Sequence, residues 1–103
     1  MNWSAREKQI ARAVFERAAF EEEKELLELC RARAAALKDL EEVRALEVWI
    51  RDSLREYQYK YDYRYSQLLM VFARLVREGR VEIELLEGLD DEKLLYIKRV
   101  VSL

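Results

Sequence analysis

Five tyrosines occupy every second position from residue 57 to residue 65, and they are the side chains of this chain best suited to recognition chemistry. Asp62 lies among them, and Arg55 lies two residues before the first. Tyrosine and arginine are enriched in interface hot spots, because they combine a large contact area with polar tips. On a helix, Tyr59 and Tyr63 would lie one turn apart, away from the face of the other three. These two either bind a partner protein or line a contact between copies of the chain, and the sequence leaves both interpretations open.

Residues that could catalyse a reaction are scarce. The chain has no histidine, which removes the usual general base at neutral pH and the commonest metal ligand. The single cysteine, Cys30, falls on an apolar helix face, where an inert buried thiol is expected. There is no glycine-rich phosphate loop, and a di-metal bundle would require Glu-x-x-His motifs. We therefore expect no enzymatic activity, no catalytic residue, no metal site and no cofactor.

Charge and hydropathy exclude two further classes of partner. The 19 basic and 21 acidic residues are interspersed, so no single-signed stripe for nucleic acid emerges. Pairs such as Glu47/Arg51 and Asp52/Arg55 have the spacing of surface ion pairs on a helix. The longest uncharged stretch, residues 66–73, is too short to span a bilayer. With no secretory signal and no possible internal disulfide, the chain is predicted to be cytoplasmic, without a membrane span.

Helices are expected to position these side chains. The chain has no proline and two glycines, both after residue 78, so little interrupts a helix before that point. Ser4 with Glu7, and Asp39 with Glu42, follow the capping-box pattern that begins a helix. The first helix therefore runs from about residue 4 to a turn at residues 38–40.

The second helix is predicted from apolar residues at steps of three and four. They are Val43, Leu46, Ile50, Leu54, Tyr57, Tyr61, Tyr65, Leu68, Phe72 and Leu75. The alternative, a strand through the tyrosines, has no turn signal at either end and no partner strand. We predict a helix from Leu40 to Glu78, which would be about 58 Å long if continuous, and the sequence leaves open a break near residues 58–62.

This helix is apolar on more than one face, since Val48, Trp49, Leu69 and Val71 fall outside the main stripe. Such a helix needs more than one neighbour, and a homodimer supplies the second. The residues assigned to the core or the dimer contact are Val43, Leu46, Trp49, Ile50, Leu54, Tyr57, Tyr61 and Phe72.

The last quarter of the chain is predicted to form a small head. Gly79 ends the long helix, residues 81–86 form a short helix, and Asp90 begins a final one. These pieces should fold back on residues 68–76. The predicted fold is a single all-α domain, residues 1–103, which dimerises. Residues 4–78 form its antiparallel helical stalk and residues 79–103 its head.

The chain also resembles the fluorescence recovery protein family over its whole length. The matching residues are Trp3-Ser4, Lys60-Tyr61-Asp62-Tyr63-Arg64-Tyr65-Ser66, Val71-Phe72-Ala73, Leu75-Val76, Glu78-Gly79, and Leu89 with Lys93 and Ile97. The resemblance implies a non-enzymatic helical dimer. Family members bind the photoactivated orange carotenoid protein, chiefly its C-terminal domain, and speed its return to the resting form and its release from the phycobilisome antenna.

The sequence departs from the family pattern in mid-stalk. In a match without gaps, the family's tryptophan falls at Arg44, its His-Asp pair at Glu47 and Val48, and its functional arginine at Leu54. Trp49 and Asp52 are similar in kind but displaced. The predicted partner-binding residues are Arg44, Glu47, Arg51, Asp52, Tyr59, Tyr63 and Met70.

Three functions follow. The first is a photoprotection regulator that binds a carotenoid photoreceptor and biases it toward its inactive state. The second is a helical dimer that acts as scaffold or regulator for a different protein client. In the third, the tyrosines serve only the contact between copies of the chain.

Overall fold

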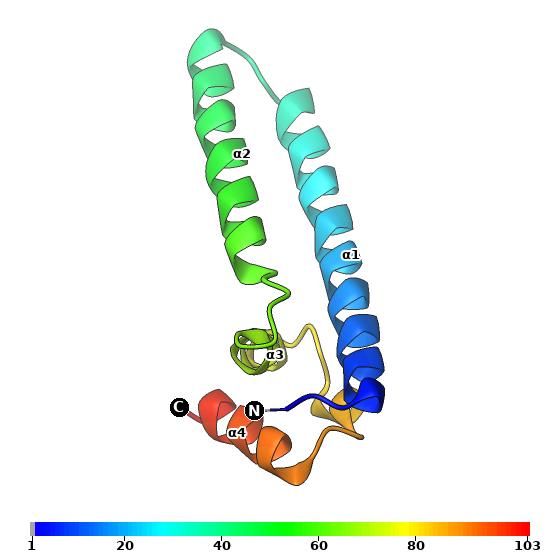
Figure 1. Cartoon of the computed structure of the whole chain (residues 1–103). Helices are drawn as coiled ribbons and strands as arrows, with labels where there is room; N and C mark the ends of the chain where they lie inside the picture. Colours follow the sequence, from blue (N-terminus) through cyan, green and yellow to red (C-terminus); the bar gives the residue numbers. More distant parts are fainter. Residues whose placement is uncertain (1) are drawn as a thin grey trace. The chain divides into compact units, whose positions relative to one another are not determined.

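The computed structural model describes residues 2–103, in which helices are the regular elements (Figure 1). The elements are α1 (Ala5–Ala35), α2 (Leu40–Lys60), α3 (Leu68–Arg77), the 3-10 turn η1 (Ile83–Leu86) and α4 (Asp91–Val101). The all-α prediction is therefore confirmed. The chain divides into two compact units, which we call the hairpin unit (residues 20–60) and the head unit (residues 2–19 and 61–103).

The predicted helix starts are confirmed by their side-chain caps. The Oγ of Ser4 accepts the N–H of Glu7 at 3.1 Å, and the Glu7 carboxylate accepts the N–H of Ser4 at 2.9 Å. Asp39 accepts the N–H of Glu42 at 2.8 Å. Asp90 caps α4 by accepting the N–H three residues later. Each cap satisfies backbone donors that the first turn of a helix leaves without partners.

The helix predicted from Leu40 to Glu78 is wrong at its centre, because α2 ends at Lys60 and α3 begins only at Leu68. Residues 61–64 have no regular secondary structure, and residues 65–67 form a turn. The hydroxyl of Tyr61 donates to the carbonyl of Ala18 at 3.2 Å, and this contact fixes the point where the helix ends. A helical periodicity in the sequence is a weak preference that tertiary contacts can override.

Two further contacts stabilise the non-helical segment 61–67 between α2 and α3. The ring of Tyr63 packs edge-on against Phe15, with ring centroids 4.8 Å apart. The guanidinium of Arg64 donates hydrogen bonds from Nε and Nη2 to the Asp62 carboxylate, with an Nε–Oδ1 distance of 2.8 Å. Side chains two positions apart do not face each other on a helix, so this pair requires the non-helical backbone.

The core lies in the head unit, where α3 packs on α4. The fully buried large side chains include Phe72, Leu68 and Leu75 of α3 and Ile97 of α4. Leu86 and Leu89 of the tail and three residues of α1 (Ala11, Phe15 and Ala18) belong to the same cluster. The predicted folding of the tail onto residues 68–76 is confirmed.

Two glycines allow the tail to turn back. Gly79, which follows the C-cap residue Glu78 of α3, takes a positive φ of 76°, and the N–H groups of Gly79 and Arg80 donate to the carbonyls of Val76 and Leu75. This is the Schellman motif that ends many helices. At Gly88 (φ of 107°) an added Cβ would lie 2.4 Å from the Cδ1 of Ile10. The predicted helix end at Gly79 is therefore confirmed, and Gly88 is required for close packing against α1.

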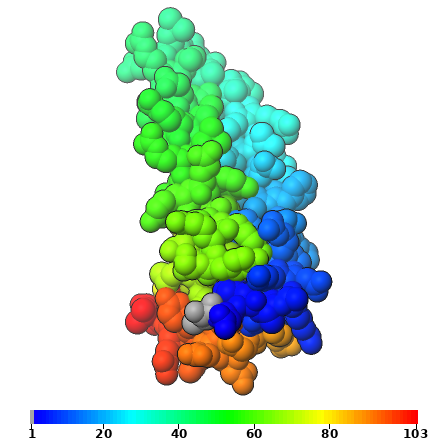
Figure 2. All heavy atoms as spheres, in the orientation of Figure 1, coloured from blue at the N-terminus to red at the C-terminus, as the bar shows by residue number. Residues whose placement is uncertain are grey.

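The hairpin unit is built differently, because it has no apolar core of its own. Residues 20–35 of α1 and the whole of α2 run antiparallel (Figure 1), and their side chains meet along the hairpin in the space-filling view (Figure 2). The ammonium of Lys60 lies 2.8 Å from the Glu22 carboxylate, and Arg33 stacks over the ring of Trp49 at 4.2 Å. Among residues 20–60 the only side chain in the buried class is Lys60.

Candidate functional site

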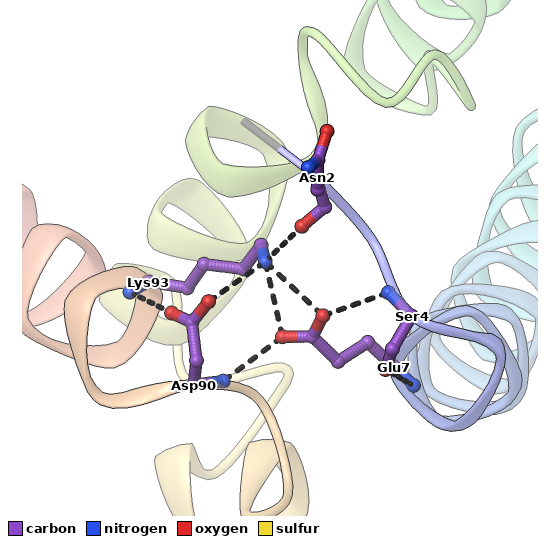
Figure 3. Close-up of polar contacts among 5 residues, drawn as sticks. All are labelled: Asn2, Ser4, Glu7, Asp90 and Lys93. Carbon is purple, nitrogen blue, oxygen red and sulfur yellow. Dashed lines mark hydrogen bonds and ion pairs between the residues drawn. The ribbon is translucent and has the colours of Figure 1, made fainter.

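A polar cluster at the start of α1 and α4 organises the head unit (Figure 3). Lys93 is completely buried, and its Nζ lies 3.0 and 3.2 Å from the two carboxylate oxygens of Glu7. The same ammonium donates to Asp90 at 3.1 Å and to the backbone carbonyl of Asn2. The ring of Trp3 lies 4.8 Å away. We call this set, Asn2, Trp3, Ser4, Glu7, Asp90 and Lys93, the head knot.

The charges of the head knot satisfy one another. The pKa of Glu7 is lowered to about 2, chiefly by the hydrogen bond from the Ser4 N–H; burial opposes this shift, while the Asp90 N–H and Lys93 contribute to it. Burial would lower the pKa of Lys93, but its bonds to Glu7 and Asp90 outweigh burial and raise it. Both groups are therefore ionised at neutral pH. With every charge paired, the head knot fixes the two helix starts rather than offering a reactive group.

The sequence interpretation missed the head knot, although a signal was present. Leu89, Lys93 and Ile97 recur at steps of four, and the first and last are buried. A lysine inside an apolar stripe at helical spacing indicates a buried ammonium, which requires carboxylate partners. The carboxylate of Glu7 was recognised only as part of a helix cap.

The segment 61–67 forms an aromatic and cationic cluster on α1. The ring of Tyr65 lies 5.6 Å from Trp3 and 5.7 Å from Tyr63. Arg12 stacks on Tyr63 at 4.2 Å, and Lys8 lies over Tyr65 at 5.2 Å. The Tyr63 hydroxyl is buried and has no hydrogen-bond partner among residues 2–103. The prediction that Tyr63 shares a helix face with Tyr59 is therefore wrong, since Tyr63 is outside any helix.

Most predicted partner-binding residues lie on α2 and are exposed. Tyr59 is 78% exposed, and Arg44 and Asp52 are also in the exposed class. The predicted pair of Glu47 with Arg51 is confirmed at 3.6 Å, with both side chains largely in solvent.

The other predicted ion pair, Asp52 with Arg55, is wrong. Within the described part of the chain, neither side chain has an ion pair or a hydrogen bond. Residues at i and i+3 of a helix can form an ion pair, but an exposed pair adds little to the stability of the fold. Both charges therefore remain available to an external group.

The remaining predicted partner residue, Met70, belongs to the head unit. Its side chain is 49% exposed on α3, and its sulfur accepts a hydrogen bond from the Tyr96 hydroxyl of α4 at 3.1 Å. Methionine is adaptable and common at binding surfaces. Met70 and Tyr63 thus lie in the head unit, whereas Arg44, Glu47, Arg51, Asp52 and Tyr59 lie in the hairpin unit.

The residues predicted as core or dimer contact divide in the same way. Phe72 is fully buried in the head core, and Tyr61 is half-buried beside Phe15. In the hairpin unit, Leu46, Trp49, Ile50 and Tyr57 are half-buried, while Val43 and Leu54 are exposed. Burial raises the pKa of Tyr57, and the nearby Glu23 and Glu22 carboxylates raise it further.

Residues 2–103 also bear on two other kinds of site, a membrane span and a metal centre. No helix there is long and apolar enough to cross a membrane. No group of three carboxylate, cysteine or histidine side chains in that range could hold a metal ion.

Comparisons with known proteins agree with this architecture. The family model described as "Photoprotection regulator fluorescence recovery protein" matches residues 3–101. The fluorescence recovery protein of Synechocystis sp. (strain ATCC 27184 / PCC 6803 / Kazusa) is 34% identical over 101 residues, which cover 98% of this chain and 93% of the relative.

Two solved structures are similar over almost the whole chain. The Fluorescence Recovery Protein of Fremyella diplosiphon matches with a TM-score of 0.93, and that of Synechocystis sp. PCC 6803 with a TM-score of 0.91. Each is 33% identical, and each match covers 99% of this chain and 100% of the other. The chain belongs to the fluorescence recovery protein family of photoprotection regulators.

Proposed function

We propose that this protein is a cytoplasmic homodimer, not an enzyme, which binds the photoactivated orange carotenoid protein through that protein's C-terminal domain. Binding accelerates the return of the photoreceptor to its inactive state. Family membership supports the regulatory role. The single structural observation that carries the binding proposal is the largely exposed Tyr59 on α2, whose side chain has no hydrogen bond or ring contact within residues 2–103.

Homodimerisation is supported by the apolar surface of the hairpin unit. Phe20 is 58% exposed and Leu54 is 50% exposed, and no apolar side chain of residues 20–60 is in the buried class. Burial of apolar surface contributes about 25 cal/mol per Å². A second hairpin laid against Val43, Ile50 and Leu54 would supply the missing core. We therefore assign these residues to the dimer contact.

Client binding is supported by the types of residue that stay exposed. Tyr59, whose side chain has no hydrogen bond or ring contact within residues 2–103, leaves its ring available to a client, and tyrosine and arginine are enriched in binding hot spots. Tyr59 lies on the same helix as Arg44, Arg51 and Asp52. We assign these residues, with Glu47, to the client surface of the hairpin unit, and the exposed Met70, with the half-buried ring of Tyr63, to that of the head unit.

A binding protein can shift its client only through a difference in affinity. The client equilibrium moves toward the inactive state when that state, or the transition state leading to it, is bound more tightly than the active one. A tenfold difference in affinity corresponds to about 1.4 kcal/mol. No catalytic group is needed for this action.

The decisive experiment mixes the purified protein with photoactivated orange carotenoid protein and follows the dark recovery of the resting absorbance. The proposal predicts a faster recovery and a stable complex by gel filtration. A recovery rate that stays unchanged at saturating protein would overturn the proposal.

Tyr59→Ala separates client binding from dimer contact. Because this side chain is exposed and unpartnered, the variant should remain a folded dimer and bind the client at least about tenfold more weakly. Loss of the dimer would instead favour the interpretation in which the tyrosines serve only self-association. Lys98→Ala, a surface change on α4, serves as the matched control.

A second candidate function is regulation of a different client. The positions that match the family's mid-stalk tryptophan and arginine are Arg44 and Leu54 here, which favours an altered binding surface. Affinity capture from the native source, with Tyr59→Ala as the negative control, tests this candidate. A carotenoid protein in the captured fraction would rule it out.

A further inference from the structure

Met70 is the one methionine within residues 2–103, and it lies at the surface of the head unit. Its neighbours in the sequence, Leu69 and Val71, are buried in the head core, whereas Met70 itself is 49% exposed. The only cysteine of the chain, Cys30, is half-buried in the hairpin unit. A small reagent dissolved in water can therefore reach the Met70 thioether directly.

A hydrogen bond gives this thioether a fixed side and an open side. The hydroxyl of Tyr96 on α4 donates to the Met70 sulfur at 3.1 Å, and Tyr96 is itself 40% exposed. A thioether sulfur has two lone pairs and accepts hydrogen bonds only weakly. The Tyr96 hydroxyl engages one lone pair, and the other is left for an incoming reagent.

We propose that Met70 is a modification site, at which a hydroperoxide such as hydrogen peroxide converts the thioether to one epimer of the sulfoxide. The free lone pair of the sulfur attacks the terminal peroxide oxygen, so that an S–O bond forms as the O–O bond breaks. The departing oxygen takes up the proton of the attacked oxygen and leaves as water. The sulfur is thereby oxidised by two electrons, and the peroxide is reduced by two.

The hydrogen bond from Tyr96 determines which epimer forms. Addition of oxygen makes the sulfur a chiral centre, and separate classes of methionine sulfoxide reductase reverse the oxidation of the two epimers. Because Tyr96 covers one lone pair, the oxygen adds to the other, and the product should be mainly one epimer. A free methionine side chain, which has no such cover, gives both.

The oxidation has a regulatory consequence that rests on the proposed function, in which Met70 belongs to the client surface of the head unit. A thioether is apolar and adaptable, which suits a contact between proteins. A sulfoxide is polar, and in a closed contact its oxygen loses water without gaining a donor. Oxidation should therefore weaken client binding at least about tenfold, and the photoreceptor would stay active for longer until a reductase restores Met70.

The modification is tested without the client. Cys30→Ala removes the competing thiol, and this parent protein is treated with hydrogen peroxide together with a short methionine peptide as reference. Peptide mass spectrometry should find one added oxygen on Met70 while the reference is being consumed, and one reductase class should remove almost all of it. Tyr96→Phe keeps the ring but lacks the donor, so each reductase class should remove about half.

Two results of this experiment would overturn the proposal. The first is a Met70 that stays unoxidised after the reference peptide is consumed. The second is a parent protein from which each reductase class removes about half of the added oxygen, as in Tyr96→Phe. Far-UV circular dichroism after treatment shows that the oxidised chain is still folded.

A second experiment measures client binding after the peroxide has been removed with catalase. The affinity of the parent should fall at least about tenfold on oxidation and return after treatment with the effective reductase. Met70→Leu has no thioether, so its affinity before and after peroxide should be the same. An oxidised parent that binds as the untreated one does, or an equal loss in Met70→Leu, would refute the regulatory consequence. If the untreated parent does not bind the client, the proposed function fails, while the mass spectra still decide the modification.

Discussion

Replacement of Lys93 by methionine should strongly destabilise the head unit. Methionine has a similar apolar stem but no ammonium, so it removes the cation of the head knot. The Glu7 carboxylate, which is 7% exposed, would remain buried without its cation. Removal of one partner of a buried ion pair costs about 3–5 kcal/mol, because the other charge is left uncompensated.

The pKa of Glu7 gives a second estimate of the stability contribution of the head knot, of similar size. Folding lowers this pKa from 4.5 to about 2, and one pKa unit corresponds to about 1.4 kcal/mol, so the ionised carboxylate contributes roughly 3 kcal/mol at neutral pH. The N–H groups of Ser4 and Asp90 share in this contribution. The double variant Glu7→Gln/Lys93→Met should therefore recover only part of the loss, about 1–2 kcal/mol.

The sign of the pH dependence follows from the direction of the shift. A carboxylate whose pKa is lower in the folded state stabilises the fold above its unfolded pKa, and this stabilisation is lost as the pH falls through the folded value. For Glu7 the loss should occur between about pH 5 and pH 2. The difference in unfolding free energy between wild type and Glu7→Gln should shrink over that interval.

Urea unfolding at one protomer concentration measures these effects. Trp3, whose ring lies 4.8 Å from the Lys93 ammonium, reports on the head knot once Trp49→Phe removes the other tryptophan. Concentration must be fixed because self-association adds to apparent stability. A Lys93→Met variant within about 0.5 kcal/mol of its parent would refute the reasoning, as would a double variant no more stable than the single one.

Further predictions concern the head unit and use the same unfolding assay. Gly88→Ala should lower the free energy of unfolding by more than about 1 kcal/mol, because the residue has a positive φ and the added Cβ would also meet a side chain of α1. Gly79→Ala should cost less, because a Cβ there has open space. Equal losses for the two variants would contradict the close approach of Gly88 to α1. Tyr61→Phe removes a hydrogen bond to α1 and should cost about 1 kcal/mol, whereas Tyr63→Phe removes a buried hydroxyl without a partner and should be neutral or stabilising. Phe72→Ala should cost about 3–5 kcal/mol, and a loss below 1 kcal/mol would show that its pocket collapses.

The helical class and most helix ends could be predicted from local chemistry. Capping residues such as Ser4, Asp39 and Asp90 bond to backbone groups within one turn, so neighbouring residues in the sequence are enough to predict their effect. Gly79 likewise acts locally. The helix predicted from the apolar periodicity agrees with α2 as far as Lys60, because this periodicity is also a local pattern.

The break after α2 and the head knot could not be predicted in this way. The break depends on Tyr61 reaching Ala18, far away in the sequence, while the local periodicity favours a continuous helix. Glu7 and Lys93 lie at opposite ends of the chain, and the sequence around either residue does not indicate that the other is its partner. Partners distant in sequence are fixed by the tertiary fold, so single-sequence patterns leave them undetermined.

The most direct measurement of function is the rate of dark recovery of photoactivated orange carotenoid protein with increasing amounts of this protein. The proposed function predicts a rate that rises and saturates, and a response that Tyr59→Ala shifts to higher concentration without loss of fold. A recovery rate independent of the protein, at concentrations where the protein is folded and dimeric, would contradict it.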